Sequence, residues 1–211
     1  DGATAFNNDI LKWDVSSVTN MGKMFSGAIS FNSDLSQVNV SCVDNIPGIK
    51  WDVTSVSSME RMFLGASTFN GKLSQWNVSL VTNMRGMFGG ATSFNSDLSQ
   101  WDVSSVTSMP GMFRDARSFD RDISKWDVSS VSNMDSMFRG AMVFKRQLCG
   151  SAWVHSKATK SVMFAGSSGS ISRTVCTTAT SAFSPQSNSE LKDAIDGYLK
   201  LSPKGDCSDC Q

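Results

Sequence analysis

The sequence predicts an α/β fold, a right-handed solenoid of 25-residue coils in which each coil combines a short parallel strand with a short helical turn. Three observations lead to this prediction. Aromatic residues return every 25 residues, apolar side chains within each repeat follow helical spacing, and a glycine follows the predicted helical turn in most repeats. Polar residues separate the apolar ones, so each repeat leaves an apolar face that only a neighbouring repeat can cover.

The aromatic residues set the phase of the repeat. Phe6 and Phe31 are 25 residues apart, and the phenylalanines from Phe69 to Phe144 follow one another at the same interval. We number this phenylalanine repeat position 1; tryptophan then recurs at position 8, valine at positions 10 and 13, and methionine at positions 16 and 19. Methionines at such spacing beside phenylalanine and valine are typical of a core rather than of a metal site. The predicted core ladder contains Trp13, Trp76, Trp101, Trp126, Phe69, Phe94, Phe119, Met84, Met109 and Met134.

Within one repeat, the apolar pattern changes its period. The segment 98–101 is too short for a helix and predicts a brief strand. The apolar residues from Val106 to Phe113 stand at i, i+3, i+6 and i+7, which predicts a helical turn, and Ser104 or Ser105 can cap it. Strand, capped turn and glycine together indicate a leucine-rich-repeat-like coil. The glycines that end the turn are Gly27, Gly65, Gly90 and Gly140.

One interval departs from the period, because Phe31 and Phe69 are 38 residues apart. We interpret the excess as an insertion at residues 38–50, since Pro47 and Gly48 suit a loop. A truncated repeat is the alternative, because the valines and isoleucines of this segment imitate the apolar positions of a coil. The repeat solenoid therefore spans residues 1–144. A degenerate terminal coil or cap follows at 145–182, and an amphipathic helix with a cysteine-containing tail at 183–211.

Composition and motifs argue against several function classes. The chain has 19 Lys and Arg against 19 Asp and Glu, so it lacks the positive field with which nucleic-acid-binding proteins attract phosphate. Its apolar runs are far shorter than the roughly 20 residues of a membrane-spanning helix. His155 has no recognisable catalytic partner, and no GxxxxGK[ST], HExxH or GxSxG motif occurs. We therefore predict a protein that is not an enzyme, with no catalytic residues, no cofactor and no metal site.

Four of the five cysteines lie outside the regular repeats, in the predicted cap and tail. Cys149 and Cys176 are 27 residues apart, about one coil, and neighbouring coils lie within the Cα distance that a disulfide accepts. Cys207 and Cys210 form a CxxC. For this pair we favour disulfides in an oxidising compartment over a redox pair or half of a zinc site.

Two Asn-x-Ser sequons begin at Asn39 and Asn77, which are candidate glycosylation sites of a secreted protein. Asn77 stands at repeat position 9, where other repeats carry aspartate. Regularly spaced carboxylates can bind calcium, but an aspartate in a turn usually accepts hydrogen bonds from the backbone of that turn. We favour turn capping for this row, whose aspartates are Asp14, Asp52, Asp102 and Asp127.

Two consecutive repeats read LSQWDVSSVTSMPGMFRDARSFDRDISKWDVSSVSNMDSMFRGA. They resemble the BspA-like leucine-rich-repeat surface proteins, in particular their short W-D-V-S-x-V-x-x-M-x-x-M-F class, and the resemblance covers about residues 1–165. It implies a secreted or cell-surface protein, of a type found in bacteria and in unicellular algae such as diatoms, that acts in attachment or partner binding. By the same resemblance, the segments LCGSAWV and GDCSDC look like a junction between arrays, after which a further array could follow.

We therefore expect a non-enzymatic extracellular or cell-surface repeat protein that mediates adhesion or protein binding, with other proteins or surface glycans as partners. One alternative is a structural component of an extracellular assembly or polymer, which predicts self-association. A weaker alternative is ice or mineral binding through a flat face of serine and threonine. Leu80 interrupts that face at position 12, which disfavours the last alternative.

Overall fold

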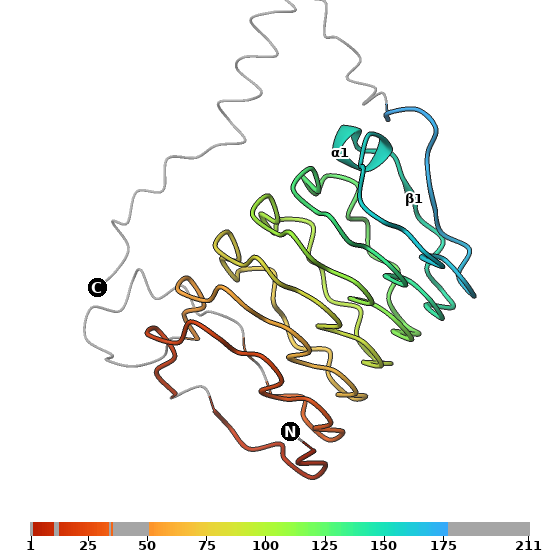
Figure 1. Ribbon diagram of the computed structural model, residues 1–211. Helices are drawn as coiled ribbons and strands as arrows, with labels where there is room; N and C mark the ends of the chain where they lie inside the picture. Colours follow the sequence, from red (N-terminus) through yellow and green to blue (C-terminus); the bar gives the residue numbers. More distant parts are fainter. Residues whose placement is uncertain (1, 11–12, 34, 36–50, 177–211) are drawn as a thin grey trace, which may run out of the picture. The chain divides into compact units, whose positions relative to one another are not determined.

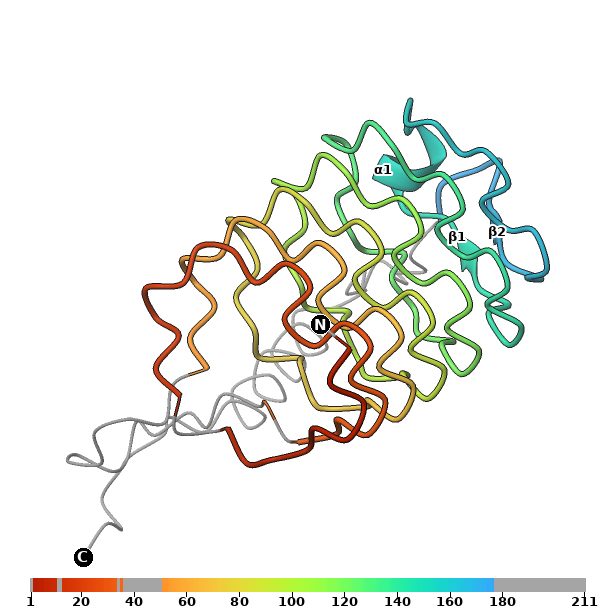
Figure 2. The same ribbon diagram turned by 60° about the horizontal axis from the view of Figure 1, so that its bottom comes forward.

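The structure is a computed structural model that describes residues 2–10, 13–33, 35 and 51–176. These residues belong to one compact unit, Asp1–Cys176. Within it the chain runs through successive loops of similar outline that lie side by side, as Figures 1 and 2 show from two directions. The predicted insertion at 38–50 and the predicted amphipathic helix and tail at 183–211 lie outside the described residues.

The predicted fold class is wrong. The described part of the chain contains one helix, α1 (Ser151–Val154), and two strands, β1 (Gln147–Leu148) and β2 (Ser170–Ile171), which pair in parallel. Neither a strand nor a helical turn recurs from repeat to repeat, so the coils of the predicted leucine-rich-repeat-like α/β solenoid are not formed. The repeats consist instead of turns, and isolated parallel bridges link Asn20, Ser58, Asn83, Ser108, Asn133 and Thr159 in that order.

The predicted strand at 98–101 is a β-turn. The N–H group of Trp101 donates to the carbonyl of Leu98 at 3.1 Å, which closes a four-residue turn. The side chain of Asp97 supports this turn by accepting a hydrogen bond from the Ser99 N–H at 2.9 Å. In a strand, residues three apart point to opposite faces. The turn instead lets Leu98 and Trp101 both point to the interior, where they are 0% and 3% exposed.

The predicted helical turn is a series of β-turns whose N–H groups alternate between two kinds of partner. The Met112 N–H donates to the Met109 carbonyl, three residues back, at 3.3 Å, whereas the Phe113 N–H donates to the Met137 carbonyl of the next repeat at 2.9 Å. An α-helix requires every N–H to bond four residues back, and a left-handed φ of 61° at Gly111 is also incompatible with it. Spacing at i and i+3 therefore arises from successive turns, not from a helix.

Two positions of each repeat have left-handed backbone. At position 22 the glycines predicted to end the turn have φ between 67° and 71°. Position 18 is left-handed as well, although it carries a side chain in most repeats, where φ lies between 46° and 58°. Because a side chain in this conformation costs about 1–2 kcal/mol, packing between repeats must impose it. The residues with side chains at position 18 are Lys23, Arg61, Ser136 and Val162.

The interior consists of columns in which the same residue type lies in neighbouring repeats. Phe113 and Phe119 stack within one repeat with ring centroids 3.9 Å apart, and Phe119 stacks on Phe144 of the next repeat at 5.9 Å. All three are 0% exposed. Stacked aromatic pairs add to the stabilisation that burial of their apolar area provides. Among the predicted ladder residues, those buried in this way are Trp76, Trp101, Trp126, Phe69, Phe94, Phe119, Met84, Met109 and Met134.

The interval of 38 residues leaves these columns in register. Phe25 stacks on Phe63 with ring centroids 5.5 Å apart, and Nε1 of Trp51 donates to the carbonyl of Ile10 at 2.8 Å. Trp51 therefore takes repeat position 8, next to the first repeat. The described repeats on either side of the interval are direct neighbours.

Candidate functional site

One recurring hydrogen bond holds the tryptophan column. Nε1 of Trp101 donates to the carbonyl of Leu73 at 2.9 Å, and Nε1 of Trp126 donates to that of Leu98 at 2.9 Å. Each acceptor is position 5 of the preceding repeat. A buried indole N–H without an acceptor would be costly, so this bond fixes both the depth and the orientation of the ring. Trp51, Trp76 and Trp153 make the same bond, to Ile10, Leu35 and Ile123.

Trp153 stands two residues later than the period predicts, yet it completes the column. It lies in α1, is 0% exposed, and its Nε1 donates to the Ile123 carbonyl at 3.0 Å. The short helix thus accommodates the two additional residues of the last repeat. Its place in the sequence alone does not show that it belongs to the column.

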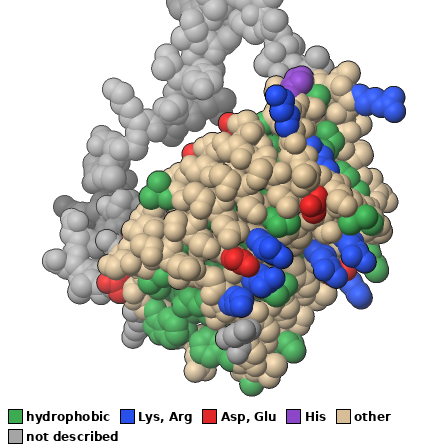
Figure 3. All heavy atoms as spheres, in the orientation of Figure 1, with side chains coloured by type: hydrophobic (Ala, Val, Ile, Leu, Met, Phe, Trp, Pro, Cys, Tyr) green, Lys and Arg blue, Asp and Glu red, His purple; other side chains and the backbone are tan. Residues whose placement is uncertain are grey.

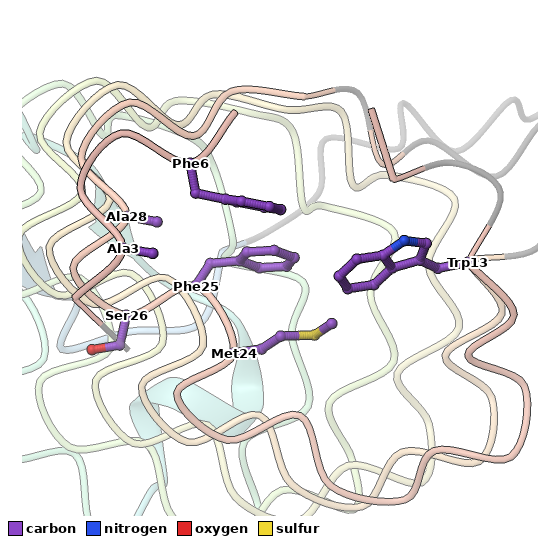
Figure 4. Close-up of a pocket in the computed structure, with 7 residues that line it drawn as sticks. All are labelled: Ala3, Phe6, Trp13, Met24, Phe25, Ser26 and Ala28. Carbon is purple, nitrogen blue, oxygen red and sulfur yellow. The ribbon is translucent and has the colours of Figure 1, made fainter. Parts of the chain in front are cut away.

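Trp13 is the exception to the predicted buried ladder, because it is 46% exposed. Its indole faces the rings of Phe6 and Phe25 across a cavity of about 210 Å³, with Met24 at the edge (Figure 4). Among the described residues, only the segment 2–5 precedes this first repeat. In later repeats, the preceding repeat covers the indole and its position-5 carbonyl accepts the indole N–H. The described residues contain no such carbonyl for Trp13.

The backbone at the same end of the stack carries a row of free acceptors. Within the described ranges, no group donates to the carbonyls of Asn20, Gly22 and Met24, which correspond to carbonyls that accept hydrogen bonds in every later repeat. The next carbonyl of the row, at Ser26, accepts a hydrogen bond from the Gly2 N–H at 2.7 Å. This end therefore combines an apolar hollow with an unpaired backbone edge.

A second ladder, at repeat position 2, is a feature that the sequence analysis missed. Oδ1 of Asn70 accepts a hydrogen bond from the Asn95 N–H at 2.8 Å, and Oδ1 of Asn95 accepts one from the Asp120 N–H at 3.1 Å. Asn32 and Asp120 make the equivalent bonds to Asn70 and Lys145. The signal was an asparagine directly after the recurring phenylalanine, at Asn7, Asn32, Asn70 and Asn95.

The position-9 row closes turns, as the sequence predicts. Oδ1 of Asp102 accepts hydrogen bonds from the Ser104 N–H at 3.0 Å and from the Ser104 hydroxyl at 2.6 Å. These bonds favour the charged form and hold the pKa of Asp102 below its ordinary value. Bonds from Ser129 lower the pKa of Asp127 in the same way. No group of three or more His, Cys, Asp or Glu within the described ranges is arranged to hold a metal ion.

Asn77 belongs to the same row and is exposed. Its Oδ1 accepts hydrogen bonds from the N–H of Ser79 at 3.1 Å and from its hydroxyl at 2.7 Å, so the sequon lies in a surface turn. Exposure keeps Asn77 accessible to a modifying enzyme, and it stays a candidate. The other candidate, Asn39, lies outside the described residues.

A disulfide joins Cys149 to Cys176, with their Cα atoms 5.0 Å apart. The Cys176 N–H also donates to the Cys149 carbonyl at 2.7 Å. Together with the pairing of β1 and β2, this bridge ties the segment after Gly166 to the last repeat. The other two disulfide candidates, Cys207 and Cys210, lie outside the described residues.

A shallow hollow beside α1 contains His155 together with Ser151 and Asp127. Nδ1 of His155 lies 3.0 Å from the Ser151 carbonyl oxygen and 3.3 Å from the Ser151 hydroxyl. Both contacts are to the residue four positions earlier, so they hold the His155 ring against α1.

The exposed corner of each repeat is a β-turn between an alanine and the position-1 phenylalanine. The Phe119 N–H donates to the Ala116 carbonyl at 3.1 Å, and the same bond closes this turn in the neighbouring repeats. The alanine and the phenylalanine are buried in every repeat, but the two residues between them vary. They are Ile29 and Ser30, Ser67 and Thr68, Thr92 and Ser93, Arg117 and Ser118, and Met142 and Val143.

Comparison with protein families finds one that is described as "Mycoplasma protein of unknown function, DUF285", which matches residues 1–49 and 47–153. The chain belongs to this family. Searches of curated proteins and of solved structures gave no match. Within the described part of this DUF285 protein, no helix has the length and apolar character needed to span a membrane.

Proposed function

We propose that this DUF285 protein is a non-enzymatic, BspA-like extracellular or cell-surface protein that binds other proteins or surface glycans and so mediates adhesion. The contrast between interior and corner carries the proposal. Ala91, Ala116 and Ala141 are equally buried in successive repeats, whereas the residue after them is a half-buried threonine at Thr92 and an exposed arginine or methionine at Arg117 and Met142. A constant scaffold with varied exposed positions is the arrangement by which repeat proteins commonly bind macromolecules.

Two further observations support an extracellular location. The Cys149–Cys176 disulfide is of a kind that persists in oxidising compartments and is rare in the cytosol. Asn77 offers an exposed sequon in a surface turn. Both features agree with the resemblance to surface proteins that the repeats suggest.

The proposal is tested with the whole chain, oxidised and fluorescently labelled, on intact cells of the native source and on their extracellular matrix. We expect saturable binding that unlabelled chain competes away. The reduced and denatured chain serves as the control for non-specific adsorption. Binding that rises linearly with concentration, or that the control reproduces, would contradict adhesion. Antibody labelling of intact against permeabilised cells tests the location separately.

A structural role in an extracellular assembly is the second candidate, and the first repeat favours it. Trp13 and the cavity beside it expose aromatic surface of the type that neighbouring repeats cover elsewhere in the chain. Self-association through this end predicts a sedimentation coefficient that rises with concentration and falls back in the Trp13→Ser variant. A chain that remains monomeric at the highest soluble concentration would contradict this candidate.

A further inference from the structure

Two exposed apolar side chains interrupt the polar corner of the stack in its last complete repeat. Met142 and Val143 are 62% and 48% exposed, although Ala141 and Phe144 on either side are 0% exposed. The turn is closed in the usual way, by the bond from the Phe144 N–H to the Ala141 carbonyl at 3.1 Å. The fold therefore does not require two apolar residues here, because the equivalent pairs are Ser67 and Thr68, Thr92 and Ser93, and Arg117 and Ser118 in the preceding repeats, and Ile29 and Ser30 in the first.

Two basic residues stand next to this apolar pair, one in the preceding repeat and one along the chain. Arg117 occupies the position of Met142 in the preceding repeat, and Lys145 follows Phe144 directly; both are exposed. Neither side chain has an acidic partner in the described part of the chain, whereas Arg146 pairs with Asp120 at 3.1 Å. In the space-filling view, Lys and Arg side chains gather on the lower right of the face shown, with hydrophobic side chains and a few Asp and Glu side chains among them (Figure 3).

We propose that Arg117, Met142, Val143 and Lys145, here named the basic corner, bind an acidic polypeptide segment that also carries apolar side chains. The inference rests on the proposed protein-binding function and names the surface and the partner. Methionine and arginine are enriched in protein interfaces, and the apolar centre of an interface contributes most of its affinity. A polyanion without apolar groups would pair with Arg117 and Lys145 but would leave the side chains of Met142 and Val143 exposed to water.

The distance between neighbouring repeats determines which side chains of a bound acidic peptide can reach Arg117 and Met142. Parallel bridges join equivalent residues of neighbouring repeats, such as Asn133 and Thr159, and backbones paired in this way lie about 4.8 Å apart. Alternate side chains of an extended peptide lie about 6.6–6.8 Å apart on one face, so residues i and i+2 of a peptide along the stack can reach the long side chains of Arg117 and Met142 on successive repeats. An acidic residue then meets Arg117 when an apolar residue two positions along meets Met142.

A peptide of repeating Glu-Ser-Leu-Ser units is the probe, titrated with the oxidised whole chain and followed by fluorescence anisotropy. The repeats supply substitutions that their own fold already accepts. Met142→Thr with Val143→Ser copies the central corners, and Arg117→Thr with Lys145→Asn copies repeat positions 24 and 2. We expect each double variant to weaken peptide binding about tenfold. The charge variant should lose its effect at high salt, because screening removes the attraction in both proteins.

The matched control removes two positive charges at repeat positions 17 and 18, which lie outside the corner turn. Lys23→Gly and Arg85→Ser both have natural counterparts, in Gly111 and Ser161 of other repeats. Peptide affinity should stay at the wild-type value in this control, and circular dichroism should be the same for all variants. An equal loss in the control would overturn the basic corner, because net charge alone would then explain the binding.

Peptides of Glu-Ser-Ser-Ser and Lys-Ser-Leu-Ser units, and a sulfated polysaccharide, complete the test. The Glu-Ser-Ser-Ser peptide and the polysaccharide lack apolar side chains. If either binds as tightly as Glu-Ser-Leu-Ser, and if the loss of Met142 and Val143 does not weaken that binding, the proposed partner is wrong. Failure of the Glu-Ser-Leu-Ser peptide to bind would overturn it as well. If the wild-type chain nevertheless binds cells saturably, the proposed adhesion stands and this inference alone fails.

Discussion

Replacement of Trp101 by alanine should lower the free energy of unfolding by about 3–5 kcal/mol. The indole is 3% exposed, and its ring stacks on that of Trp126 with centroids 6.4 Å apart. Its removal opens a cavity between two repeats. The Leu73 carbonyl, which now accepts the indole N–H at 2.9 Å, would also lose its donor, and this moves the loss towards the upper end of the range.

The measurement is urea unfolding of the whole chain, followed by circular dichroism. Trp13→Ala is the matched control, because Trp13 occupies the same repeat position at 46% exposure and its replacement should cost about half as much, about 2 kcal/mol. Trp101→Phe should fall between the two, since it keeps an aromatic ring but not the N–H. The slope of the transition must stay constant, because a smaller slope would mean that only part of the stack unfolds. Equal losses for Trp101→Ala and Trp13→Ala would refute the idea that the column stabilises the fold.

Three other properties can be tested on the same chain. Val162→Gly should raise the free energy of unfolding by up to about 1 kcal/mol, because φ is 46° at this exposed β-branched residue; a loss in urea unfolding would contradict strain there. Replacing Cys149 and Cys176 by serine removes a link between residues 27 apart and should cost about 3–4 kcal/mol; melting temperatures with and without reductant would then coincide in the variant but not in the wild type. Because the folded-state pKa values of Asp102 and Asp127 lie below 3.8, their contribution is present above pH 3.8 and lost as the pH falls through the lowered values. Unfolding between pH 7 and 2.5 should show this loss, reduced in Asp102→Asn; identical pH profiles would contradict it.

The period and the buried columns could be predicted from the sequence because recurrence reports directly on neighbouring repeats. Phe94, Met109 and Trp126 return at a fixed interval, and each is buried where that interval places it. Local conformation could not be predicted in the same way. The spacing of Met109 and Met112 fits a helix and a β-turn equally well. The choice depends on hydrogen bonds to a repeat about 25 residues away, which no local pattern contains.

The candidate binding features were predicted only in part. The pairing of Cys149 with Cys176 followed from their separation of about one repeat. The exposure of Trp13 did not, because the residues that follow Trp13 and Trp101 are the same (WDVSSVT) and the difference lies in the repeat that covers each ring. The Asn70 and Asn95 ladder was missed because asparagine after phenylalanine reads as an ordinary polar spacer. Its regular recurrence was the available signal.

The acceptor row of the first repeat determines which backbone groups can pair with it. The carbonyls of Asn20, Gly22 and Met24 would face identical oxygens if two copies met through this end, so a two-fold symmetric pair is disfavoured here. A joining chain must bring N–H groups, as Gly2 does for the Ser26 carbonyl. A neighbouring segment, whether of this chain or of another, would therefore pair with the row through its own N–H groups.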